Sequence, residues 1–209
     1  RYDGDWISDD FCNNNGCSGG NDNASYSYTR DKDKTIIDVK FLAGNDTLSQ
    51  GDSQHVIGLY ANESNEDLTY TNISTFAGNT FLTSDYKTQR YALYGEYEYA
   101  VSDQLVIALS ARGERFSEDY RDSNNVNKNN DSNLFNVELN AQYYLSDNVS
   151  IYGIIAQATK PGGVNVNATS QIPSMSPAFQ TLMANRLEFE EETLLNKEVG
   201  LKSSLLKDR

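Results

Sequence analysis

The chain has 209 residues, a formal net charge of -13 and a hydrophobic fraction of 38%. This acidic balance argues against a nucleic-acid partner, because the few cations cannot neutralise a row of phosphates. No continuous apolar stretch is long enough for a membrane-spanning helix, although a membrane-spanning strand needs an apolar residue only at every second position.

Residues 1–25 are predicted to be a loop, because Asn, Asp, Ser and Gly cluster there. Cys12 and Cys17 lie close together in this segment, within DFCNNNGCSGGND. A disulfide between them would fit an oxidising compartment such as the periplasm or the cell exterior, and free thiols are the alternative. A metal site would need more ligands, and the single histidine, His55, is distant in sequence.

From Tyr26 onward, apolar residues recur at every second position, which predicts β-strands. Most of these strands have one apolar face and one face of charged or amide side chains, and the high tyrosine content suits such sheets. About seven strands are expected within residues 26–206, at 26–44, 55–68, 90–100, 105–116, 134–145, 149–160 and 193–206.

The predicted connections alternate in length along the chain. Short turns are expected near 45–54, 101–104 and 146–148, and long polar loops near 62–85, 118–132 and 161–191. Short and long connections then fall at opposite ends of an antiparallel, up-and-down sheet. This sorting is typical of an outer-membrane β-barrel, with short periplasmic turns, long external loops, an apolar outer band and a polar lumen. The fold class is therefore all-β, as part of a large transmembrane barrel.

The polar strand faces hold the candidate functional residues. Five charged residues are predicted to face the lumen: Glu96, Glu98, Arg112, Glu114 and Glu138. They would either form a polar track for a substrate or simply line a solvated interior that faces a plug domain. We expect no enzyme and no cofactor, because the chain has one histidine, no G-x-S-x-G motif and no metal-ligand cluster. The acidic loops also lack the full set of spaced oxygen ligands of a calcium loop.

Two ordered motifs carry a family resemblance. The first ends a strand in a K-x-G-G-x-N run, formed here by Lys160, Gly162, Gly163 and Asn165. The second has the form F-x-P-E-x-x-x-x-Y-E-x-G-x-K, which this chain matches at Phe189, Glu192, Glu198, Gly200 and Lys202, with Glu191 and Lys197 replacing the usual Pro and Tyr. Together they resemble the TonB-dependent outer-membrane receptors.

The resemblance implies a location and a function. Residues 1–209 would be a fragment from the middle of a receptor barrel, in which 1–25 is an extracellular loop and the plug domain is missing. The receptor would lie in the bacterial outer membrane and take up a ferric siderophore or a similar nutrient. Its partners would be membrane lipid, the small ligand and the TonB complex, reached through the plug. The alternative is a secreted, soluble β-sandwich that serves as a binding or adhesion module.

Overall fold

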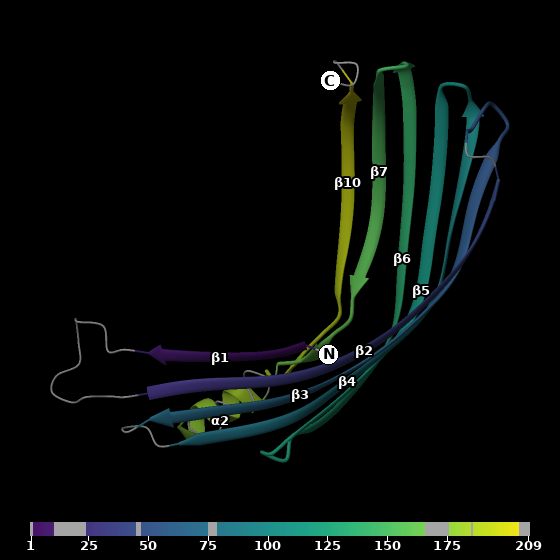
Figure 1. Ribbon diagram of the computed structural model, residues 1–209. Helices are drawn as coiled ribbons and strands as arrows, with labels where there is room; N and C mark the ends of the chain where they lie inside the picture. Colours follow the sequence, from purple (N-terminus) through teal and green to yellow (C-terminus); the bar gives the residue numbers. More distant parts are fainter. Residues whose placement is uncertain are drawn as a thin grey trace, which may run out of the picture.

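The computed structural model describes residues 2–10, 24–44, 47–74, 79–165, 176–184 and 186–204. Its main sheet has eight antiparallel strands in the order β1-β2-β3-β4-β5-β6-β7-β10 (Figure 1). Their bounds are β1 Tyr2–Asp10, β2 Ala24–Gly44, β3 Ser53–Ser74, β4 Thr80–Ser102, β5 Leu105–Asp122, β6 Asn127–Ser146, β7 Val149–Lys160 and β10 Glu192–Ser203. The predicted all-β, up-and-down architecture is confirmed.

The described part of the segment between β7 and β10 contains three small elements. Strands β8 (Gly163–Val164) and β9 (Glu188–Phe189) pair as a short antiparallel hairpin, and helix α2 (Pro177–Ala184) precedes β9. No helix in the described part of the chain is long and apolar enough to cross a membrane.

The strand register gives the main sheet one apolar face and one polar face. Tyr97, Leu109 and Leu139 are direct neighbours across β4, β5 and β6, so the alternating apolar positions of these strands align. Side chains on this apolar face are exposed on most strands, and Val199 of β10 reaches 83% exposure. Apolar side chains that stay exposed in such a continuous band need a covering layer, which lipid supplies in an outer-membrane barrel.

Two of the expected long loops are mostly strand. The loop predicted near 62–85 is replaced by the ends of β3 and β4, and the loop predicted near 118–132 by the ends of β5 and β6. These extensions contain buried apolar residues such as Leu68, Leu82 and Tyr120 but no regular apolar alternation, yet their backbone ladders are complete across the register. Backbone pairing and these buried side chains together maintain the sheet there.

The connection between β5 and β6 is a tight turn. Oδ1 of Asp122 accepts hydrogen bonds from the backbone N–H groups of Asn124 and Val126, at 2.9 and 3.0 Å. Asn125 adopts a φ of 63°, in the left-handed region that Asn tolerates better than most residues. Local side-chain bonding thus closes a chain reversal where the sequence pattern indicated a long loop.

The prediction of a loop over 1–25 is wrong for Tyr2–Asp10, which forms β1 and pairs with β2 from Tyr2↔Lys32 to Asp10↔Ala24. Its sequence has no apolar alternation, so the ladder with β2 is what defines this strand. Cys12 and Cys17 lie outside the described residues. The assignment of this segment to the extracellular side stays a prediction.

The opposite end of the sheet carries the expected short turns (Figure 1). Oγ of Ser102 accepts the N–H groups of Gln104 and Leu105, and Oγ of Ser146 accepts the N–H of Asn148. The strand register also shifts beside each of these turns. Bulges of this kind are common at barrel rims, where they bend the strand into the turn.

Candidate functional site

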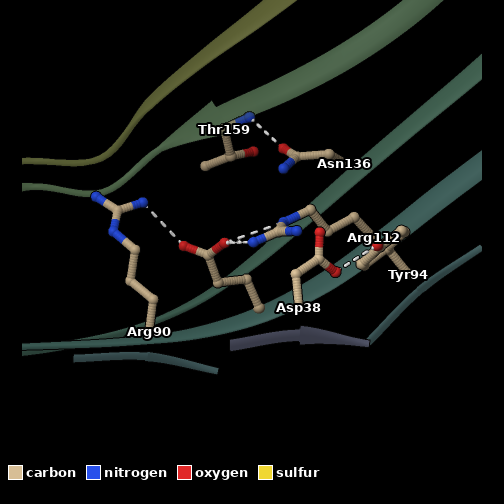
Figure 2. Close-up of polar contacts among 7 residues, drawn as sticks. Asp38, Arg90, Tyr94, Arg112, Asn136 and Thr159 are labelled. Carbon is tan, nitrogen blue, oxygen red and sulfur yellow. Dashed lines mark hydrogen bonds and ion pairs between the residues drawn. The ribbon is translucent and has the colours of Figure 1, made fainter. Parts of the chain in front are cut away.

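An ion-pair cluster lies in the middle of the polar face. Figure 2 shows Arg90 of β4 and Arg112 of β5 directed toward the same carboxylate, which is that of Glu114. Arg90 Nη1 donates to Oε1 at 2.9 Å, while Arg112 donates to Oε2 through Nε at 3.0 Å and Nη2 at 2.5 Å. The Glu114 side chain is only 5% exposed, so both of its oxygens are used and shielded.

Aromatic rings also contact the two guanidinium groups that bind Glu114. Arg90 lies over the ring of Phe116 at 4.6 Å, and Arg112 lies over the ring of Tyr60 at 4.9 Å. Such contacts are favourable because the negative face of the ring attracts the cation. The cluster therefore links β3, β4 and β5 through alternating charge and aromatic contacts.

Tyr94 extends the network to β2. Its hydroxyl donates to Asp38 Oδ1 at 2.6 Å (Figure 2). Lys40 forms an ion pair with Asp38 at 3.3 Å. To reach β2 from β4, the ring passes over Gly58 of β3, and a Cβ at Gly58 would overlap it. The glycine is therefore required by the close approach of the tyrosine, as in the aromatic covering of strand glycines.

Three of the five predicted lumen residues line one hollow beside this network. The hollow measures about 290 Å³, and Glu96, Arg112 and Glu138 contribute to its lining. Glu114 touches it indirectly through its ion pair with Arg112, and Glu98 lies two positions further along β4 on the same face. The carboxylate of Glu96 also accepts a hydrogen bond from Ser110 at 2.9 Å. The lining of the hollow thus combines one guanidinium, already paired with Glu114, and two carboxylates.

The residues of the first motif lie where β7 leaves the main sheet. Lys160 forms an ion pair with Glu192 at 3.7 Å and lies over the Phe189 ring at 5.6 Å. A Cβ at Gly162 would come within 2.5 Å of the Phe189 carbonyl oxygen, so this position has no room for a side chain. The N–H of Asn165 donates to the Leu187 carbonyl at 2.6 Å. Both motifs therefore meet at the β8–β9 hairpin.

The remaining residues of the second motif surround one tyrosine. The Tyr152 hydroxyl of β7 donates to Glu198 Oε1 at 2.5 Å, and Lys202 lies over its ring at 4.7 Å. The ring crosses Gly200, where a Cβ would overlap it. Glu198, Gly200 and Lys202 thus all contact Tyr152. Its ring lies over Gly200 in the same way that the Tyr94 ring lies over Gly58.

Sequence reasoning missed a buried carboxyl group under the hairpin. Glu118 of β5 is 2% exposed, and its Oε1 accepts the Val164 N–H at 3.1 Å. Burial raises the pKa of Glu118, and the hydrogen bond from Val164 opposes that shift. Its even position on β5, in step with Arg112 and Glu114, is a signal for the polar face, but the polar composition of 118–132 predicts a loop. Arg90 and Asp38 were missed although they also lie on the polar face.

No group of three or more His, Cys, Asp or Glu residues among the described ranges is arranged to hold a metal ion.

Comparisons with known proteins agree with this geometry. Residues 1–209 match the family described as TonB dependent receptor-like, beta-barrel. Among solved structures, the chain is similar to the ferric yersiniabactin uptake receptor FyuA from Yersinia pestis, with 19% sequence identity and a TM-score of 0.58. The match covers 88% of this chain and 27% of that receptor, and an identity this low indicates a common fold alone. No curated protein matches the sequence significantly.

Proposed function

The chain belongs to the TonB-dependent receptor β-barrel family, and on that premise we propose that it forms part of the wall of a receptor in the bacterial outer membrane. The receptor imports a small nutrient, in the first instance a ferric siderophore. Its role is capture and transport rather than catalysis. The FyuA receptor is named for uptake of such an iron complex, which supports this choice of ligand class.

The observation that carries the proposal is the division of the sheet into two faces. The apolar face is exposed on strands from β2 to β10, whereas the polar face carries the network of Arg90, Glu114 and Arg112. A soluble sandwich would bury the apolar faces against each other. In a transporter barrel the apolar face meets lipid and the polar face meets the aqueous lumen.

In this proposal the predicted residues have distinct roles. The charged residues Glu96, Glu98, Arg112, Glu114 and Glu138 line the lumen and keep it polar. The motif residues shape the rim, where Lys160 and Phe189 turn the chain from β7 into the external segment. The TonB complex acts from the inner membrane on a plug domain, which then opens the lumen to the captured ligand.

The test uses the full-length receptor in its own host. We expect it in the outer-membrane fraction, with a gel mobility that changes on heating because a closed barrel resists unfolding. A deletion strain should lose uptake of at least one radioactive ferric siderophore under iron limitation, and the intact gene should restore it. A soluble protein without a heat shift would instead favour the secreted β-sandwich.

A further inference from the structure

Strand β6 continues past the point where its neighbour β7 leaves it. β6 has 20 residues, whereas β7 has 12 (Figure 1). The β6–β7 ladder ends at Val137↔Gln157, but the β5–β6 ladder continues to Arg121↔Asn127. No strand in the described part of the chain pairs with the other side of β6 between residues 127 and 136. We call this stretch the free edge of β6.

Two side chains fix the point where β7 leaves β6. Asn136 Oδ1 accepts the backbone N–H of Thr159 at 2.6 Å (Figure 2). The Thr159 hydroxyl donates to the Phe135 carbonyl at 3.4 Å. These contacts replace the backbone pair that would have continued the ladder. The free edge therefore begins at a defined junction.

The hydrogen-bond pattern shows which backbone groups lie along the free edge. At the two ends of the β5–β6 pair, Tyr144 N donates to Gln104 O at 2.8 Å and Asp122 N donates to Val126 O at 3.0 Å. The register between these bonds is unbroken, so even-numbered residues of β6 bond to β5. Odd-numbered residues such as Asn129 direct their N–H and C=O groups to the free edge.

A hollow of about 660 Å³ lies along this edge. A sheet face would contribute only alternate residues to such a hollow, because successive side chains of a strand point to opposite faces. Here five consecutive residues of β6, from Lys128 to Ser132, contribute to the lining, so the hollow follows the edge. Its opposite wall is the β8–β9 hairpin, through residues 162–164 and 188–191.

The hollow has more carboxylates than cations. Its one cation, Lys128, is paired with Glu188 at 2.8 Å. Asp131 accepts the Ser117 hydroxyl at 2.6 Å, and Glu190 and Glu191 add two further carboxylates on the hairpin. The adjoining residues 166–175 contain no charged side chain, so this balance does not depend on them. The hollow therefore favours a cationic occupant.

We propose that the free edge of β6 binds an extended, cationic peptide segment of another molecule as an added antiparallel strand. Unpaired strand edges accept such segments through backbone hydrogen bonds, and side chains at alternate positions supply specificity. Basic side chains at every second position would face Glu190 and Glu191. The inference goes beyond import of an iron complex, which has no strand backbone to pair.

The probe is a fluorescein-labelled peptide of alternating lysine and threonine, as long as residues 127–136, titrated into the purified full-length receptor. Fluorescence anisotropy measures its binding. In an antiparallel pair, residues that exchange hydrogen bonds have their side chains on the same face. The odd residues of β6 point away from the hairpin, so the threonines should bond to β6 while the lysines face the hairpin. N-methylation of the threonines should weaken binding more than about 10-fold, and N-methylation of the lysines should have little effect.

Asn129 allows a matched pair of receptor variants. Asn129→Pro removes an N–H that faces the free edge and spares the ladder with β5, and proline is tolerated at such edge positions. It should weaken peptide binding about 5-fold, as expected for one backbone hydrogen bond. Asn129→Ala removes the same side chain but keeps the N–H, and should change binding less than about 2-fold. Combined Glu190→Gln and Glu191→Gln should weaken the lysine peptide and reduce its salt dependence.

The outcomes decide both the edge and the charge. Stronger binding of the N-methyl-lysine than of the N-methyl-threonine peptide, together with new hydrogen-exchange protection of residues 127–136, supports the added strand. Equal binding of these two peptides, or equal effects of Asn129→Pro and Asn129→Ala, overturns it. Protection of these amides in the free receptor also overturns it, because the chain itself would then cover the edge. Equal binding of a glutamate–threonine peptide overturns the cationic partner. Each of these failures leaves the proposed receptor function intact.

Discussion

Glu114 is the carboxylate that neutralises two arginines on the polar face, so its replacement tests the ion-pair cluster. Glu114→Gln removes the negative charge that lies between the guanidinium groups of Arg90 and Arg112. Because the arginine side chains are 36% and 29% exposed, water reduces the penalty. We expect a loss of about 1–2 kcal/mol in the free energy of unfolding.

Urea unfolding of the full-length receptor in lipid vesicles measures this loss. Glu96→Gln is the matched control, because Glu96 is exposed and has one described hydroxyl donor, Ser110. It should change stability by no more than about 0.5 kcal/mol. Equal effects of the two substitutions would contradict the central role of Glu114.

Glu118 makes docking of the hairpin depend on pH. Its pKa is raised when it is buried under Val164, so the docked state binds a proton more readily than the undocked state. Docking is therefore most stable at acidic pH, below the ordinary glutamate pKa, and weakens as the pH rises through the raised value. Glu118→Gln, which is neutral at every pH, should remove this dependence.

Hydrogen exchange of residues 162–165 in the full-length receptor, corrected for intrinsic rates, reports the docking. Wild-type protection should fall from acidic to neutral pH, and the Gln variant should show a flat profile. Glu188→Gln is a useful comparison, since it removes the ion pair with Lys128 but leaves Glu118 in place. A pH dependence that persists in Glu118→Gln would mean that another group titrates.

At the level of single residues, the sequence predicts which face of the sheet a side chain lies on better than it predicts the ion-pair partner of that side chain. Residue parity was enough to place Glu96, Arg112 and Glu138 on one face, and the register brings them to one hollow. Parity does not reveal which cation meets which carboxylate, because that depends on the stagger between strands. Arg90 contacts Glu114 directly, but the two residues are 24 positions apart, so the sequence alone does not predict their contact.

At the level of elements, tyrosine rings that cross strand glycines connect strands: Tyr94 reaches from β4 to β2, and Tyr152 from β7 to β10. Gly200→Ala would force the Tyr152 ring away from Glu198 and Lys202 and should destabilise the β7–β10 pair by about 1 kcal/mol. Gly113→Ala is the matched control, because no atom lies within 4 Å of the Cβ it would add. It should be neutral or slightly stabilising, since alanine restricts the unfolded chain.

Combining Gly200→Ala with Tyr152→Leu tests whether the crossing of the Tyr152 ring over Gly200 causes the loss of stability. If the overlap with the ring causes the loss, the alanine should cost less once the ring is absent, so the two effects will not add. Urea unfolding in vesicles measures all four proteins of this cycle. Fully additive effects would show that Gly200 is needed for another reason.

The strands were predictable where one face has to be apolar and not elsewhere. In the middle of β4, the alternation of Tyr91, Leu93 and Tyr97 with polar residues marks the strand clearly. The part of β4 before residue 88 has Phe81, Leu82 and Tyr86 but no regular apolar alternation, so its sequence resembles a loop although its ladder with β3 continues to Thr80. Where the alternation stops, the sequence loses the signal while the hydrogen bonds remain.

For the whole molecule, the central prediction is that the two faces have different solvents. Leu139 and Asn140 are adjacent on β6 and point to the apolar and polar faces respectively. Leu139→Arg should destabilise the full-length receptor in vesicles by about 2–4 kcal/mol, as for arginine near the middle of a bilayer. Asn140→Arg should cost much less, because the polar face is proposed to be hydrated. Equal costs would favour a buried protein interface over lipid.

The length of the central strands has a further consequence for capture. Strand β4 has 23 residues, of which a bilayer needs only about 10. The rest extends for about 40 Å along the strand, or about 30 Å above the bilayer after allowing for its tilt. At physiological ionic strength the Debye length is about 8 Å, so charges on the lipid headgroups are screened at that height. A charged ligand that reaches the rim would respond to the charged side chains of the rim itself, and its capture should be insensitive to the charge of the surrounding membrane.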